Sequence, residues 1–132
     1  GGWTNGPWLL ELFSRGFDKM YLRHGRTGRI LVWKILFASE LTSRRGMMGQ
    51  GDLRLADGVG IFAGSGSLAS VPVQNPLDLV ALDRDLKVVA VYPAILPAQA
   101  GRVRVEKLLG LSAGAAARAD LRCGDTLELG LC

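Results

Sequence analysis

The sequence has few of the side chains that metal centres and acid–base enzymes most often use. It holds one histidine, His24, and two cysteines, Cys123 and Cys132. Zinc sites prefer clusters of histidine and cysteine, and these residues do not follow a recognised ligand spacing. A disulfide scaffold would also need more cysteines in so short a chain. We therefore expect no metal and no cofactor, while the pairing of Cys123 with Cys132 stays open.

Long hydrophobic runs and a nucleotide-binding loop are also missing. No apolar run reaches the roughly 18–20 residues that span a bilayer. The glycines at 46, 49 and 51 are not followed by Gly-Lys-Ser or Gly-Lys-Thr, so a P-loop is not supported. The chain begins with Gly-Gly, so a signal peptide could have preceded Gly1. The compartment stays open: a cytoplasmic or membrane-peripheral location is favoured, and export follows if such a peptide was removed.

Charge is moderate, and its positive excess lies near the N-terminus. The 132-residue chain is 48% hydrophobic and 21% charged, which is typical of a globular domain rather than a disordered segment. The net charge is +4, and residues 1–29 hold five basic against two acidic side chains. The remainder is therefore close to neutral, and we expect no nucleic-acid surface on it.

Residues 7–23 have the spacing of an amphipathic helix. Apolar side chains recur at steps of three and four, and basic side chains recur on the other side. The apolar set is Trp8, Leu9, Leu12, Phe13, Phe17, Met20 and Tyr21, and the basic set is Arg15, Lys19 and Arg23. An apolar stripe of this size is rarely left exposed to water, so we expect it to be buried against another surface. Three surfaces stay open as alternatives: the chain's own domain, a partner protein, or an anionic membrane. We divide the chain into a basic leader helix with its linker, residues 1–29, and a single β-rich domain, residues 30–132.

The clearest β signal is a pair of runs around a polar break. Leu77–Leu82 and Leu86–Tyr92 are β-prone, and three polar residues separate them. The pattern predicts a β-hairpin that lies between Pro76 and Pro93, since proline cannot donate a hydrogen bond within a central ladder. The acids of its loop are expected to form the turn rather than to bind a metal.

Further short elements complete the predicted domain. We expect strands at 30–37, within 53–62, at 103–109 and within 121–129, and a short helix at 112–120 with Ser112 as its cap. Together they predict a mainly β (α+β) fold. It would be a small β-barrel or sandwich-like domain with short helices and the N-terminal amphipathic helix.

Several motifs also stand in a characteristic order. They are Arg-Gly-Met-Met at 45–48, Gly-Val-Gly-Ile-Phe at 58–62, the Leu-Asp hairpin after Asn75, Ser-Ala-Gly at 112–114 and Gly-Asp at 124–125. In this order residues 30–129 resemble the domain of unknown function family 192, a family of small prokaryotic domains. The resemblance implies a mainly β fold with short helices, and it implies no particular activity. Pro72, Val73 and Gln74 stand where the family has Trp, Met and Lys, so any family site there would be altered in this chain.

The polar residues hardest to explain as surface groups lie near the hairpin. Asp78 stands among apolar neighbours in a strand that looks buried, and a buried carboxylate needs donors. Arg45 or the amide of Asn75 could supply them, either as a structural brace or as part of a ligand site. The tentative ligand-binding set is therefore Arg45, Gln74, Asn75 and Asp78.

No catalytic residue follows from the sequence. Gly110–Gly114 matches Gly-x-Ser-x-Gly, but the only histidine, His24, falls in the predicted leader rather than in the domain. The leading hypothesis is a non-catalytic binding or accessory module of a prokaryotic cell, with an unknown protein partner or small polar ligand. The alternatives are a small hydrolase-like enzyme using Asp78 and Arg45, or a membrane-peripheral protein recruited through residues 7–23.

Overall fold

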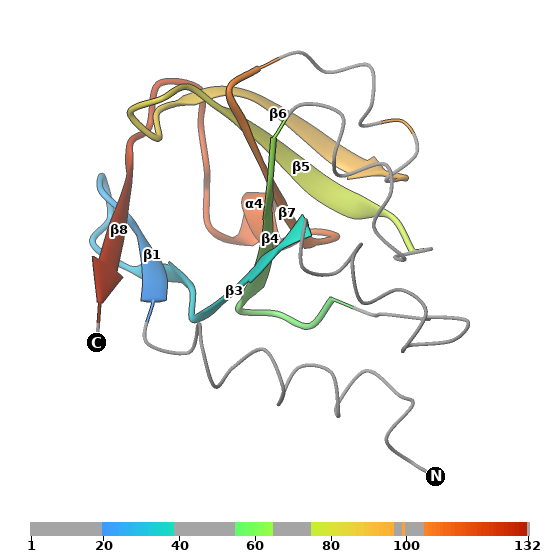
Figure 1. Ribbon diagram of the computed structural model, residues 1–132, viewed down its shortest axis with the longest axis horizontal. Coiled ribbons are helices and arrows are strands. Elements are labelled where there is room, and N and C mark those ends of the chain that lie inside the picture. Colours follow the sequence, from blue (N-terminus) through green and yellow to red (C-terminus); the bar gives the residue numbers. More distant parts are fainter. Residues whose placement is uncertain (1–19, 39–54, 65–74, 97–98, 100–104, 132) are drawn as a thin grey trace, which may run out of the picture.

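A computed structural model describes residues 20–38, 55–64, 75–96, 99 and 105–131 (Figure 1). The order of its elements is β1 (Met20–His24), β2 (Ile30–Val32), β3 (Lys34–Phe37), β4 (Val59–Ala63), β5 (Leu77–Leu82), β6 (Val88–Ile95), β7 (Lys107–Ser112), α4 (Ala115–Arg118) and β8 (Leu127–Leu131). The expected mainly β fold is confirmed. Within the described part of the chain, no helix is long and apolar enough to cross a membrane.

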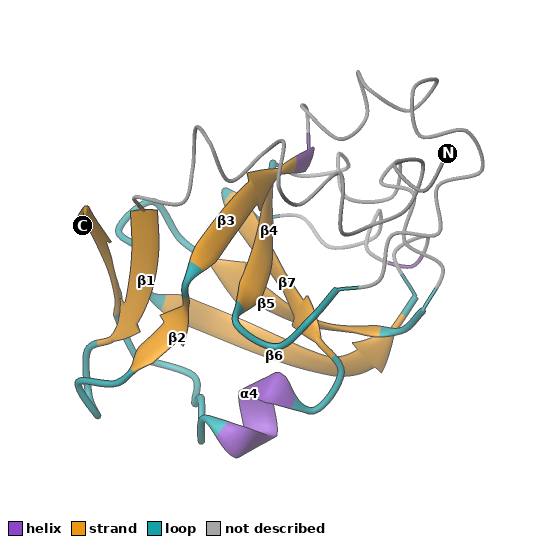
Figure 2. Ribbon diagram, turned by 90° about the horizontal axis from the view of Figure 1, so that it is seen from below, coloured by secondary structure: helices purple, strands orange, loops and turns teal. Residues whose placement is uncertain are grey.

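The strands form two sheets (Figure 2). The smaller sheet has the order β2-β1-β8, and the larger has the order β3-β4-β7-β5-β6. In the larger sheet β3 and β4 run parallel, and the other neighbouring strands are antiparallel. These strands do not close into a barrel over the residues that the structure describes. The barrel expected from the sequence is therefore not confirmed.

The two sheets meet at two places. Trp33 alone separates β2 from β3, so the single strand expected at 30–37 is divided between the sheets. At the second place, the end of the hairpin contacts the start of β8. The N–H of Val88 donates to the carbonyl of Asp125 at 2.7 Å, and the N–H of Leu127 donates to the carbonyl of Leu86 at 2.9 Å. These backbone bonds fix one sheet against the other.

β5 is buried along its whole length, between β6 and β7. The strand expected at 77–82 is confirmed at both of its ends. The second strand of the hairpin, expected at 86–92, is confirmed over 88–92, but β6 starts at Val88 because Leu86 lies in the turn with φ of 63°. In that turn Asp83 Oδ1 accepts the N–H groups of Asp85 and Lys87 at 2.8 and 3.0 Å. The acid of this loop therefore forms the turn, as expected.

β6 also continues through Pro93, which the sequence analysis placed beyond the strand. β6 is an edge strand of the larger sheet. Proline has no N–H to donate, and it is tolerated in an edge strand because one side of that strand has no neighbouring strand to bond.

The N-terminal boundary needs a correction. Residues 20–24 were expected in the leader helix or its linker, but they form β1, which pairs with β8 along its whole length. Burial alternates along this stretch, with Leu22 and His24 inside and Arg23 outside, which is the period of a strand. Residues 20–24 therefore belong to the β domain. The helix expected over residues 7–19 lies outside the described residues.

Both sheets and α4 contribute to one hydrophobic core. Its buried members are Leu22, Val32, Ile35, Val80, Leu82, Val88, Leu109, Leu111, Ala116, Leu121 and Leu127. Met20, Phe37, Phe62 and Leu86 pack against this cluster but are only partly buried. The core thus has a side at which large apolar groups remain accessible.

Candidate functional site

Asp78 is buried at the second position of β5. Its Oδ1 accepts a hydrogen bond from the N–H of Ala94 at 3.0 Å. Its Oδ2 accepts from the N–H groups of Gly114 and Ala116 at 3.0 and 2.9 Å. These donors are backbone groups of β6 and of the start of α4, whereas the sequence pointed to side chains. Because both oxygens are occupied, the arrangement favours a structural brace over a ligand contact.

The other members of the predicted site do not gather around Asp78 in the described part of the chain. Arg45 and Gln74 lie outside the described residues. Asn75 is exposed just before β5, and no hydrogen bond joins it to Asp78 among the described contacts.

Ser112 does not cap a helix. It ends β7, and Gly114, with φ of 91°, is the N-cap residue of α4 without a side-chain cap bond. The Oγ of Ser112 donates instead to Asp57 Oδ1 at 2.6 Å, and Arg118 donates to the same oxygen at 2.7 Å. The prediction for Ser112 is wrong because Asp78, distant in sequence, takes the free N–H groups at the start of α4.

We predict that Asp78→Ala destabilises the domain. Loss of the carboxylate leaves three backbone donors without their acceptor, and a stranded buried group costs about 1–3 kcal/mol. Urea unfolding at neutral pH measures the difference, with the exposed turn variant Asp85→Ala as the matched control. Equal unfolding free energies for the two variants would contradict the bracing role.

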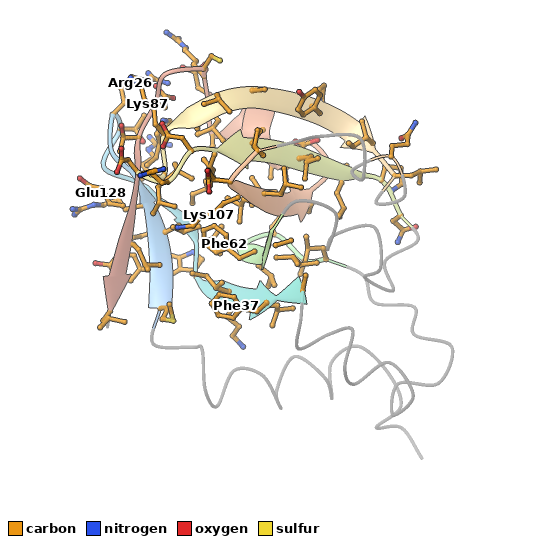
Figure 3. The ribbon with its side chains drawn as sticks, turned by 45° about the horizontal axis from the view of Figure 1, so that its top comes forward. Arg26, Phe37, Phe62, Lys87, Lys107 and Glu128 are labelled. Carbon is orange, nitrogen blue, oxygen red and sulfur yellow. The ribbon has the colours of Figure 1, made fainter. Side chains whose placement is uncertain are left out.

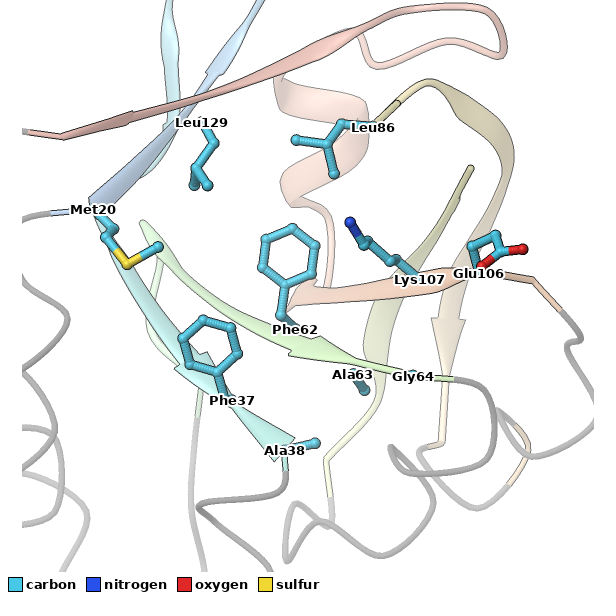
Figure 4. A pocket seen from close by; sticks show the side chains of 10 residues that line it. All are labelled: Met20, Phe37, Ala38, Phe62, Ala63, Gly64, Leu86, Glu106, Lys107 and Leu129. Atoms are coloured by element: carbon cyan, nitrogen blue, oxygen red, sulfur yellow. The ribbon is translucent and has the colours of Figure 1, made fainter. Parts of the chain in front are cut away.

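An apolar cavity of about 390 Å³ opens at the accessible side of the core (Figure 4). The strands β1, β3, β4 and β8 each supply one large apolar side chain, and the turn before β6 supplies a fifth. β7 supplies a charged side chain. Its described lining is Met20, Phe37, Ala38, Phe62, Ala63, Gly64, Leu86, Glu106, Lys107 and Leu129. We call this space the apolar cavity.

Strand register sets the aromatic wall of the apolar cavity. Phe37 of β3 and Phe62 of β4 are direct partners in the parallel ladder. Side chains at paired positions lie on the same face of a sheet, and the two rings stack with centroids 6.4 Å apart and planes 17° from parallel. Figure 4 shows both rings beside the cavity, and Figure 3 labels them in the whole molecule.

Lys107 brings a positive charge to this wall. Its ammonium reaches into the space beside Phe62 and Leu86, whereas Glu106 lies farther along the rim (Figure 4). Among the described residues, Lys107 forms no ion pair. The cavity therefore combines an apolar body with one available cation.

A second group of polar residues joins β1 to the loop before β8. His24 Nε2 lies 2.6 Å from Asp125 Oδ2, and both side chains are buried. Arg26 Nε donates to Asp125 Oδ1 at 3.0 Å, and the N–H of Arg122 donates to Oδ2 at 2.9 Å. Arg26 is labelled at the upper left of Figure 3. His24 is thus part of the domain and not of a separate leader.

Asp125 is strongly favoured in its ionised form. The hydrogen bond from Arg26 is the main cause that lowers the pKa of the Asp125 carboxyl below its usual range. Burial opposes this shift, while the Arg122 N–H and His24 add to it. Because the pKa is lower in the folded than in the unfolded state, the stabilisation is present above the unfolded pKa. It is lost as pH falls toward the folded pKa.

We therefore predict that Asp125→Asn flattens the acid dependence of stability. The free energy of unfolding of the unmodified protein should fall as pH drops below about 4, where an unfolded aspartate takes up a proton. Urea titrations between neutral pH and strong acid measure both slopes, with Asp85→Asn as control. An equally steep acid dependence in Asp125→Asn would refute this assignment.

The apolar cavity and the contact between His24 and Asp125 were not predicted from the sequence. Phe37 and Phe62 are brought together by the parallel pairing of β3 with β4, which cannot be predicted from local sequence. His24 and Asp125 lie 101 residues apart. One signal was available: the alternation of Leu22, Arg23 and His24 fits a strand better than a helix.

Comparisons with known proteins show the fold but no family. No family model matches the chain, and no curated protein matches it. A candidate transcription regulator from Sinorhizobium meliloti 1021 has a similar structure, with a TM-score of 0.51 and 21% identity over 83% of this chain and 90% of that one. A protein of unknown function from Novosphingobium aromaticivorans DSM 12444 aligns with a TM-score of 0.54 and 18% identity, over 83% of this chain and 82% of that one. The resemblance to family 192 stays a prediction.

Proposed function

We propose that this protein is a non-catalytic binding module for a small molecule with an apolar body and an anionic group. The observation that carries the proposal is the apolar cavity with Lys107 at its wall. Its volume of about 390 Å³ falls in the range of small-molecule pockets, roughly 300–1,000 Å³. Such pockets are mostly apolar, with a few polar groups that fix the orientation of the ligand.

The charge of the ligand follows from Lys107. A carboxylate or similar anion could pair with its ammonium while the rest of the ligand contacts the rings of Phe37 and Phe62. Glu106 is the other ionisable group in the described lining, and it lies toward the rim. We therefore expect a ligand with an acidic group near Lys107 and an apolar tail beside the rings of Phe37 and Phe62.

The same lining supports binding over catalysis. The ionisable groups of the described lining are Lys107 and Glu106, and both are exposed, so neither is desolvated in the way that activates a catalytic lysine. The hydrolase alternative relied on Asp78 and Arg45. Asp78 does not line this cavity, and its oxygens already accept three backbone hydrogen bonds.

Calorimetric titration with decanoate tests the proposal, with decanol as the uncharged ligand of equal chain length. We expect Phe62→Ala to weaken decanoate binding by about tenfold or more, because a buried aromatic contact contributes about 1.5–3 kcal/mol. We expect Lys107→Met to weaken it by no more than about fivefold, since an exposed ion pair contributes about 0.2–1 kcal/mol.

Lys87→Met serves as the matched control, because Lys87 is an exposed lysine that does not line the cavity. It should bind decanoate as the unmodified protein does. The absence of decanoate binding would overturn the proposed function. Equal affinity for decanoate and decanol, with no effect of Lys107→Met, would overturn the anionic part of it.

A further inference from the structure

Large apolar side chains continue from the apolar cavity along one face of the smaller sheet. Met20 of β1 pairs with Leu131 of β8, and Leu22 pairs with Leu129. Paired residues, and alternate residues of one strand, place their side chains on the same face of a sheet, so all four share one face. Leu22 is buried, whereas Leu129 and Leu131 are 49% and 75% exposed. Met20 and Leu129 also line the apolar cavity (Figure 4). We call Met20, Leu129 and Leu131 the apolar strip.

The two faces of these strands differ in character. The opposite face carries an ion pair between Arg23 and Glu128, with side chains that are about half exposed. Such a pair is typical of a face in water. An exposed apolar patch that continues an apolar cavity is instead typical of an interaction site. The apolar strip is therefore the part of this sheet that is suited to packing against another element.

The chain itself leads from the apolar strip into the predicted leader helix. The apolar side chains of that helix before β1, which we call the leader stripe, are Trp8, Leu9, Leu12, Phe13 and Phe17. Phe17 stands three residues before Met20, and three residues span at most about 11 Å. Phe13 stands four residues before Phe17, which is about 6 Å along a helix. The leader stripe is thus tethered within reach of the apolar strip.

The structure weakens the case for an anionic membrane as the surface that buries the leader stripe. The basic side of the predicted helix included Arg23, but Arg23 belongs to β1 and forms its ion pair within the domain. Residues 1–19 then hold two basic side chains, Arg15 and Lys19, against two acidic ones. Two minus two leaves no net side-chain charge, whereas a helix gains from anionic lipid through a basic face.

A surface on the same chain also has an advantage over a partner protein. A short tether gives the two surfaces an effective concentration on the order of millimolar. A partner, or a second copy of this chain, has to compete with that concentration from solution. The tether and the short distance to Met20 therefore favour the chain's own domain.

We propose that the leader stripe docks on the apolar strip and on the mouth of the apolar cavity of its own domain. The docking itself does not depend on the function proposed above. One consequence does rest on that function: the leader stripe and a ligand with an apolar body compete for the same wall. Residues 8–17 would then regulate ligand binding as a tethered competitor.

Photo-cross-linking in the full chain tests the docking without any ligand. The variant Phe13→benzoylphenylalanine carries a photoreactive ketone on the leader stripe, and Arg15→benzoylphenylalanine carries it on the predicted basic side as the control. After irradiation, peptide mass spectrometry locates the new bond. We expect Phe13→benzoylphenylalanine to link within the chain to the apolar strip or the lining of the apolar cavity, and the Arg15 variant to lack these links.

A second substitution on the apolar strip probes the other side of the contact. Leu131→Asp places a carboxylate where the leader stripe would bury it, which is unfavourable without a partner for the charge. It should abolish most of the link from position 13. Val89→Asp is the matched control, because Val89 is also an exposed apolar residue but belongs to β6, and it should keep the link.

Four results would overturn the docking. The first is a link from position 13 to other parts of the chain only. The second is a link to a second copy, seen as a dimer. The third is a link to lipid alone when vesicles of phosphatidylglycerol are present. The fourth is an equal yield in Leu131→Asp and Val89→Asp.

Decanoate separates the docking from its consequence for ligand binding. At concentrations that saturate the protein, it should lower the yield of the link from position 13. An unchanged yield while calorimetry shows decanoate bound would overturn the competition. A protein that forms the link but binds no decanoate would overturn the function proposed above and leave the docking supported.

Discussion

The carboxylate of Asp78 is the interaction on which the arrangement of the described domain most depends. It stands in a fully buried strand and accepts hydrogen bonds from Ala94 in β6 and from Gly114 and Ala116 at the start of α4. A buried carboxylate is costly unless donors surround it. Here one side chain satisfies three backbone donors from two other segments. Ala94 is held with φ of 50°, an uncommon backbone state for alanine. The strand, its hairpin partner and the helix are thereby fixed relative to one another.

The apolar cavity follows from this framework. With β5 and β7 in place, the ladder continues to β4 and β3, and the register of Phe37 with Phe62 builds the aromatic wall of the apolar cavity. The pair of His24 and Asp125 fastens the smaller sheet to the loop before β8.

Local patterns predicted what depends on local sequence. The buried strand Leu77–Leu82 follows from a continuous apolar run, and the need of Asp78 for donors follows from its place in that run. The donors themselves could not be predicted, since backbone N–H groups are present at every position and only the tertiary fold selects among them. Ser112 was misread for the same reason: its place before an alanine-rich segment suggests a cap, but Asp78 occupies those N–H groups. His24 was misplaced because the apolar period of residues 7–23 was extended into β1.

Amide hydrogen exchange tests the central role of Asp78 most directly. The N–H groups of Ala94, Gly114 and Ala116 are each donated to this carboxylate, so they should exchange slowly in the unmodified protein. In Asp78→Asn only one of the two oxygens remains, and the amide nitrogen that replaces the other faces N–H donors. The account predicts faster exchange for at least one of the three amides, while amides on the ladder between β4 and β7 keep their protection. Unchanged exchange at all three positions would contradict it.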